Sequence, residues 1–163
     1  MAHDIVVIIV QVISVGLTYY FGRRSATSDF KVKTLKKRYE KAYVPYVKAL
    51  YAGFMTEDVR ELSVDARCKF FDMISHNLEY LDDETLRLYP YFYKAFLDML
   101  EYGDGNKDYA HTPDMFYQAF HAISLSILKH TQSIAKELYM PPLGEALYEN
   151  YRRNTQKKEV PLT

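Results

Sequence analysis

The first part of the chain is apolar without interruption. The run Ile5–Phe21 contains no charged residue and no proline, and it lies between Asp4 and the sequence Gly22-Arg23-Arg24. A helix of this length would extend about 25 Å, near the short limit for crossing a hydrocarbon core of about 30 Å. We therefore expect a single transmembrane helix within residues 1–24. A buried core helix is the alternative, whereas a cleaved signal peptide is disfavoured because no Lys or Arg precedes the run.

Small and polar side chains recur along one face of this expected helix. They are spaced by three or four residues, which places them within about a quarter-turn of one another: Asp4, Val7, Gln11, Ser14, Thr18 and Gly22. Helices in membranes associate through small and hydrogen-bonding residues. We predict that this polar stripe joins copies of the chain into a homo-oligomer, either as a tight dimer or as a ring around an aqueous pore. The alternative is an isolated helix, in which Ser and Thr hydrogen-bond to their own backbone.

The rest of the chain carries the three- and four-residue periodicity of amphipathic helices, and no alternating strand pattern competes with it. Helices are expected over about 28–52, a short stretch from Thr56, 63–81, 83–102, 113–139 and 143–157, with a loop over 103–111. Pro45 should bend the first of them, and Pro90 should break or bend the fourth. The sequence thus predicts an all-α cytosolic domain over 25–158, a bundle of five or six helices. Residues 159–163 are expected to be a frayed tail.

Capping residues mark several of these helix starts. Ser63 or Asp65 is expected to begin one helix, and an acidic triplet beginning at Asp82 fits the first turn of the next. Thr112 followed by Pro113 is the strongest start signal. The long helix that it opens should bury one apolar face, formed by Phe116, Phe120, Ile123, Ile127, Ile134 and Leu138, and the helix from residue 63 should bury Cys68, Phe71, Ile74, Leu78 and Leu81.

The net charge is zero, but basic residues cluster directly after the apolar run: Arg23, Arg24, Lys31, Lys33, Lys36, Lys37, Arg38 and Lys41. The positive-inside rule predicts that this side is cytoplasmic, with the N-terminus outside the cell membrane. Anionic lipid head groups are the expected partners of Arg23, Arg24, Lys36 and Lys37, and nucleic acid is the alternative. The single cysteine allows no disulfide within the chain, in keeping with a reducing cytosol.

No motif predicts a metal, a cofactor or a catalytic residue. Asp104, Asn106 and Asp108 match the first ligand positions of a calcium loop, but Tyr109 and Met115 occupy the positions that need Gly and Glu. None of the five histidines has another His or a Cys three or four residues away, so no zinc motif is visible.

The last expected helix carries a partial motif, Arg152-Arg153-Asn154 followed by Lys158. It resembles the active-site motif of the HEPN superfamily, helical bundles that often act as ribonucleases, in which an Arg and a polar residue precede a His near the chain end. Arg153 and Asn154 match, whereas Lys158 stands at the His position. Cleavage of RNA without a metal needs an imidazole as acid or base, and lysine replaces it badly. We therefore predict that the chain is not an enzyme.

The order of these parts is similar to that of the small membrane accessory proteins of RNA-targeting type VI CRISPR systems. The resemblance implies an oligomeric membrane pore that strengthens antiviral defence, has no nuclease activity of its own, and has a CRISPR effector or RNA as a partner. Three other interpretations remain open. The first is a prophage-type superinfection-exclusion protein. The second is a membrane scaffold that recruits a partner through some of its 16 tyrosines. The third is a membrane-tethered ribonuclease.

Overall fold

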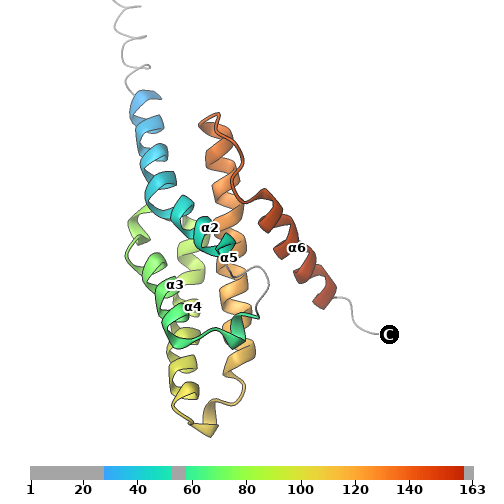
Figure 1. Ribbon diagram of the computed structural model, residues 1–163. Coiled ribbons are helices and arrows are strands. Elements are labelled where there is room, and N and C mark those ends of the chain that lie inside the picture. Colours follow the sequence, from blue (N-terminus) through green and yellow to red (C-terminus); the bar gives the residue numbers. More distant parts are fainter. Residues whose placement is uncertain (1–27, 53–57, 160–163) are drawn as a thin grey trace, which may run out of the picture. The chain divides into compact units, whose positions relative to one another are not determined.

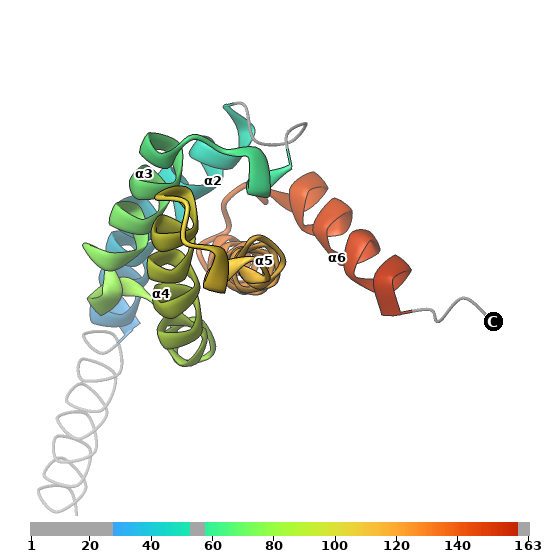
Figure 2. The same cartoon turned by 90° about the horizontal axis from the view of Figure 1, so that it is seen from below.

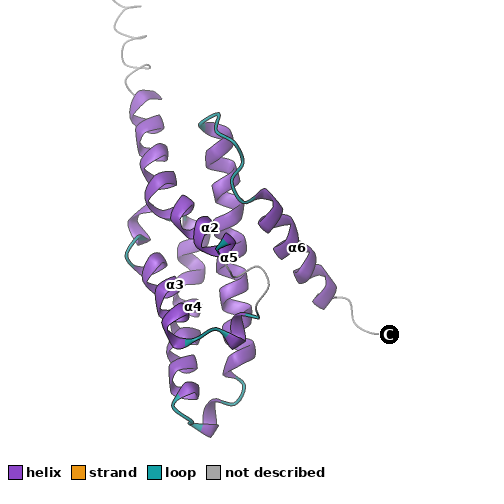
Figure 3. Cartoon of the chain, in the orientation of Figure 1, coloured by secondary structure: helices purple, strands orange, loops and turns teal. Residues whose placement is uncertain are grey.

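The computed structural model describes residues 28–52 and 58–159, which form helices joined by short loops, without a strand (Figure 3). This confirms the all-α prediction. The expected transmembrane segment and its polar stripe, Asp4 to Gly22, lie outside the described residues, as do residues 160–163. Within the described ranges, no helix is long and apolar enough to cross a membrane. The chain divides into two compact units, residues 1–36 and 37–163, and the elements from Tyr39 onward belong to the second unit.

The segment before α2 contains a π-helix. Residues 28–38 are α-helical, Tyr39–Tyr43 form the π-helix, and α2 spans Val44–Tyr51. Pro45 lies in the first turn of α2 and has no N–H to donate to a carbonyl one turn earlier. The Val44 amide donates instead to the Tyr39 carbonyl, five residues back, so the wider turn accommodates the proline. The helix ends at Tyr51, one residue before the end predicted at about residue 52.

Side-chain caps begin three of the next four helices. Asp58 caps the 3₁₀-helix Val59–Glu61, Ser63 caps α3, Val64–Ser75, and Asp82 caps α4, Asp83–Gly103. Each carboxylate or hydroxyl oxygen accepts a hydrogen bond from a backbone amide in the first turn, which satisfies a donor that the helix itself leaves free. Of the two starts predicted for α3, Ser63 is therefore the correct one.

The helix α3 is shorter than predicted. It ends at Ser75, and a separate 3₁₀-helix, Leu78–Tyr80, occupies the rest of the expected span to Leu81. The Ser75 hydroxyl donates to the Phe71 carbonyl, and the Asn77 side chain donates to the Met73 carbonyl. Such local side-chain bonds satisfy the last carbonyls of the helix and favour its termination.

Of the break or bend predicted at Pro90, the break is wrong, because Pro90 lies inside the continuous helix α4 and is exposed. The missing hydrogen bond is local, and the packing of the same helix through buried Phe92 and Phe96 offsets its cost. The predicted loop after α4 contains a 3₁₀-helix, Lys107–Tyr109.

The two last helices are α5, Thr112–Glu137, and α6, Glu145–Glu159. Thr112 is the first residue of α5 rather than its cap, and the cap position, His111, makes no side-chain cap bond. Gly144 adopts a left-handed conformation with φ of 90° just before α6. A Cβ atom there would lie 3.0 Å from a methyl group of Leu128 and 3.1 Å from one of Val47, so glycine allows the α6 connection to pack closely.

Helices α4 and α5 lie side by side and form the centre of the second unit (Figures 1 and 2). They are antiparallel, because Thr85 near the start of α4 meets Ser126 in α5, whereas Phe92 meets Phe116 near the start of α5. The predicted buried face of α5 is confirmed at Phe116, Phe120, Ile123, Ile127 and Ile134. The predicted face of α3 is only partly correct: Ile74 and Leu81 are buried, but Cys68, Phe71 and Leu78 are half-buried, and Phe70 is the ring inserted in the core.

Candidate functional site

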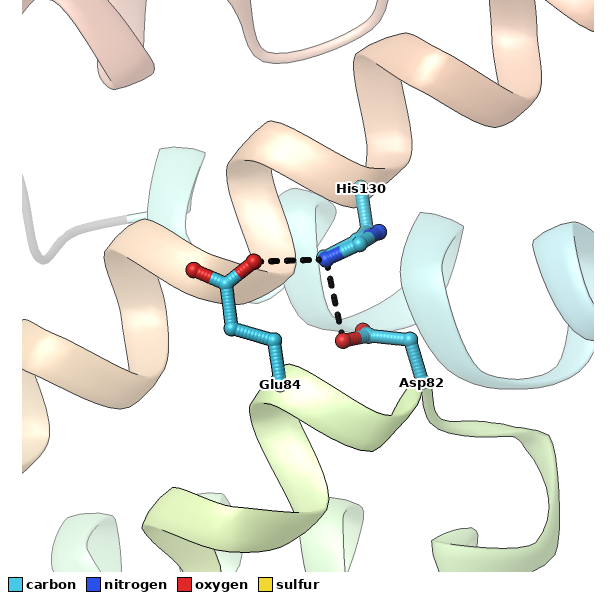
Figure 4. Close-up of side chains that lie close together, drawn as sticks. All are labelled: Asp82, Glu84 and His130. Carbon is cyan, nitrogen blue, oxygen red and sulfur yellow. Dashed lines mark hydrogen bonds and ion pairs between the residues drawn. The ribbon is translucent and has the colours of Figure 1, made fainter.

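Three side chains that bind metals or protons meet where α4 begins. Asp82 and Glu84 come from the start of α4, and His130 comes from α5 (Figure 4). The His130 Nε2 atom lies 2.9 Å from Asp82 Oδ1 and 3.2 Å from Glu84 Oε2. One ligand atom from each of the three residues lies within 4.8 Å of the other two. We call these three residues the Asp82–Glu84–His130 cluster.

The antiparallel helix pair explains why the cluster forms. Asp82 is fixed because it caps α4, and Glu84 follows in the same first turn. The α4 start lies opposite the second half of α5, where Thr85 meets Ser126. One helical turn beyond Ser126, His130 therefore points toward the two carboxylates.

Hydrogen bonds hold the Asp82 carboxylate in one orientation. Its Oδ1 accepts the Thr85 amide at 2.9 Å, and its Oδ2 accepts the Thr85 hydroxyl at 2.7 Å and the Tyr43 hydroxyl at 3.0 Å. The buried Thr85 hydroxyl is in turn 2.8 Å from the Ser126 hydroxyl. Burial by itself would raise the pKa of Asp82, but the two Thr85 bonds, the His130 charge and the Tyr43 bond together lower it. The carboxylate is thus kept ionised.

Glu84 is less constrained than Asp82. Its side chain is 50% exposed, and its Oε2 lies 2.7 Å from the Lys129 Nζ as well as close to His130. The hydrogen bond from Lys129 is the main cause that lowers the pKa of Glu84, and the His130 contact adds to it. Because Lys129 is also exposed, water and salt screen this ion pair and weaken it.

An open cavity of about 390 Å³ borders the cluster, lined by Arg38, Leu81, Asp82, Asp83, Glu84 and His130. Arg38 is anchored by its Nε, which donates to the Tyr80 carbonyl at 2.7 Å. The neighbouring Lys37 ammonium lies over the Tyr80 ring, 5.3 Å from its centre. None of the residues lining the cavity carries a hydroxyl, thiol or amine nucleophile. The groups that the lining offers are carboxylates, an imidazole and a guanidinium, and carboxylates with an imidazole are ligands that a metal cation accepts.

The HEPN-like residues are not assembled into a site in the described part of the chain. Arg152 forms an ion pair with Glu149 of its own helix at 3.0 Å, and Arg153 is exposed. The side chains of Asn154 and Lys158 lie outside the described residues. In the calcium-like segment, the Asn106 side chain accepts a hydrogen bond from the Asp108 amide at 3.2 Å, as in a polar turn.

The cluster was missed by the sequence analysis because its members are far apart in the chain. A search for ligands three or four residues apart finds sites on one helix, and His130 shares no helix with the two carboxylates. The acidic triplet at the α4 start was the only local signal. It marks a helix N-terminus as well as it marks a ligand site.

Comparison of the chain with models of known protein families, with curated proteins and with solved structures gave no match.

Proposed function

We propose that the chain is a single-pass membrane protein that presents its helical domain on the cytoplasmic side. The observation that supports this most is the uncharged run Ile5–Phe21, followed directly by a basic segment. Residues 28–34 of that segment are all exposed in the helix, including Phe30 at 73% and Val32 at 47%. Lysines beside exposed apolar side chains are typical of a helix at a membrane interface, where the lysines contact anionic head groups.

The polar stripe gives the membrane helix a second role in this proposal. A Gln side chain facing hydrocarbon leaves its amide unpaired, which costs several kcal/mol on transfer scales. Pairing between helices recovers about 0.6–2 kcal/mol for each interaction. We therefore infer that copies of the chain associate through Gln11, Ser14 and Thr18, as a dimer or as a ring that lines a pore.

The biological role that we propose is that of an effector or accessory protein in antiviral defence, linked to CRISPR systems. It rests on the layout that the chain shares with type VI accessory proteins, a membrane helix before a helical domain with a degenerate last helix. In this role the domain is not a nuclease. A membrane-tethered ribonuclease is disfavoured, because Arg153 has no histidine five residues later.

A second candidate is a membrane scaffold that binds a protein partner, as a superinfection-exclusion protein would. The specific observation in its favour is the set of exposed apolar side chains on α4. Tyr93 is 43% exposed and Leu97 42%, and they lie one turn apart on the same side of the helix, while Tyr91, 74% exposed, lies on another side. Tyrosine supplies both apolar area and a hydroxyl at low entropic cost, which makes it common in binding surfaces.

The test of self-association is the double variant Gln11→Leu with Thr18→Val, measured by oligomer size in mild detergent and by membrane permeability in cells. We expect smaller oligomers and less permeability than in the parent. The matched control is Ile9→Val with Ile13→Val, which changes the opposite face and should leave both readouts unchanged. If the apolar double variant assembles and permeabilises like the parent, the stripe has no role in association.

Topology is tested separately with a cysteine added near residue 160 in a Cys68→Ser background. An impermeant thiol reagent applied to intact cells should leave it unlabelled, and labelling should appear after lysis. Labelling of intact cells would place the domain outside and contradict the proposal.

A ribonuclease assay of the purified full chain tests the proposal that the domain is not a nuclease. We expect no RNA cleavage in the presence of a chelator. Cleavage that disappears in Arg153→Ala would make the enzyme interpretation the correct one.

A further inference from the structure

We propose that the Asp82–Glu84–His130 cluster binds a divalent first-row transition metal ion such as Zn²⁺. One ligand atom of each side chain lies within 4.8 Å of the other two, between α4 and α5 (Figure 4). The site would add a metal-dependent link between these two helices. It is independent of the membrane helix and of the proposed role in defence.

The distances agree with a metal polyhedron. Metal–ligand bonds of about 2.0–2.2 Å place neighbouring ligand atoms of a tetrahedron about 3.3–3.6 Å apart. The two edges that meet at His130 Nε2 measure 2.9 Å and 3.2 Å. The Asp82 and Glu84 oxygens lie within 4.8 Å of each other. To admit the ion, the two edges at His130 would lengthen by a few tenths of an ångström, and the half-exposed Glu84 side chain would adjust the third edge.

The donor set selects the class of metal. One imidazole nitrogen and two carboxylate oxygens suit Zn²⁺, Mn²⁺ or Fe²⁺, whereas Ca²⁺ and Mg²⁺ prefer oxygen ligands alone. Three protein ligands leave at least one coordination position open, as in catalytic zinc sites. All three ligands line the cavity of about 390 Å³, which has room for water or a small ligand beside the ion.

Hydrogen bonds orient the Asp82 carboxylate in the way that metal ligands in proteins are oriented. Thr85, fully buried, donates both its amide and its hydroxyl to the carboxylate, and Tyr43 donates a third bond. Partners of this kind orient metal ligands, and their loss typically weakens metal binding about 10–100-fold. Each Asp82 oxygen already accepts from Thr85, so Asp82 would bind the ion through the Oδ1 position that now faces His130.

An ion pair between protonated His130 and the carboxylates is the competing explanation, and Lys129 distinguishes the two. In a salt-bridged brace, the Lys129 ammonium on Glu84 adds to the attraction between the helices. In a metal site, the same ammonium competes with the ion for Glu84 Oε2 and repels it. Removal of the Lys129 charge should therefore weaken a brace but tighten a metal site.

The experiment uses the full chain, purified in mild detergent and stripped of metal by a chelator. Zn²⁺ binding is measured by calorimetry, and Co²⁺ is added as a spectroscopic probe of the ligand set. We expect one site per chain, binding of Zn²⁺ far tighter than that of Ca²⁺ or Mg²⁺, and a loss of at least about 10-fold in affinity for His130→Gln and for Glu84→Gln. The Lys129→Met variant should bind Zn²⁺ more tightly than the parent.

Two controls separate this site from nonspecific binding. Asp72→Asn changes an exposed acid of α3, and His76→Gln removes the exposed histidine that follows α3. Neither residue lines the cavity, so neither change should alter the affinity. Circular dichroism of every variant verifies that it is folded. The proposal is overturned if His130→Gln and Glu84→Gln bind like the parent, if Ca²⁺ binds as tightly as Zn²⁺, or if Lys129→Met weakens binding.

Discussion

The contact between α4 and α5 has an apolar part and a polar part. In the middle, the rings of Phe92, Phe116 and Phe120 pack with centres 6.0–6.3 Å apart, and each is buried. At the start of α4, the same two helices meet through hydroxyls, carboxylates and an imidazole. Apolar rings would have joined the helices there as well, so the polar end is not explained by helix packing alone.

The difference lies in what each half requires of its side chains. Burial of rings gives stability roughly in proportion to area and tolerates small shifts. A buried polar group stabilises only when each donor and acceptor is paired in the right geometry. The bonds from Thr85 and Tyr43 to Asp82 meet this demand. Glu84 and His130 line the cavity. There, polar groups held in fixed positions can bind the metal ion that we propose.

The largest effect is expected from Phe120→Ala in the apolar middle. The ring is 3% exposed and contacts the rings of Phe70, Phe92 and Phe116. Its loss should lower the free energy of unfolding by about 3–5 kcal/mol, and Ile123→Ala or Ile127→Ala by about 2–5 kcal/mol. Urea unfolding followed by circular dichroism measures the change. Leu97→Ala on exposed α4 surface is the control, and an equal loss there would contradict the assigned core.

A smaller effect is expected at the polar end from Thr85→Val. The variant keeps the shape but leaves Asp82 and Ser126 without the hydroxyl that they share. The cost should be about 1–3 kcal/mol, because Asp82 loses one of its donors and the buried Ser126 hydroxyl loses its partner in Thr85. In a double-mutant cycle, Ser126→Ala added to Thr85→Val should cost less than the sum of the two. Strict additivity of the two losses would show that the hydroxyl pair is not an interacting unit.

The smallest effect is expected from Tyr151→Phe in α6, and it concerns the loss of stability at high pH. Burial raises the pKa of the Tyr151 hydroxyl to about 12, above its ordinary value of 10.0, and the ring stacks on His121 with centres 4.8 Å apart. The folded state favours the neutral phenol, so its contribution is complete below pH 10 and is lost as the pH rises toward 12. Tyr151→Phe should therefore lose stability less steeply than the parent over this range. Identical slopes would show that Tyr151 ionises as freely in the fold as outside it.

Most of the fold was predictable because the relevant physics is local. The start at Ser63, the acidic first turn after Asp82 and the buried face through Phe116 and Phe120 follow from capping and periodicity. The break predicted at Pro90 was wrong, since packing of the same helix overrides one missing hydrogen bond. The early end of α3 was missed because Ser75 and Asn77 bond to carbonyls of their own helix, a choice that periodicity does not reveal.

The candidate site was not predictable in the same way. His130 meets Asp82 and Glu84 only because α4 and α5 are antiparallel and aligned at Thr85 and Ser126. Neither the pairing of these two helices nor their register is contained in the spacing of residues along one helix. From the sequence, Asp82 is therefore predicted only as a helix cap. Its place in the cluster is evident only from the structure.

Thermal unfolding with and without Zn²⁺ tests most directly whether the polar end is a metal site rather than a brace. Without metal, the parent and Glu84→Gln should differ by less than about 1 kcal/mol, because Glu84 is half-exposed. With Zn²⁺ at about 100 times the dissociation constant, the parent should gain about 2.7 kcal/mol, and Glu84→Gln should gain little. Equal stabilisation of both proteins by Zn²⁺, or a large loss in Glu84→Gln without metal and no effect of Zn²⁺ on the parent, would contradict this.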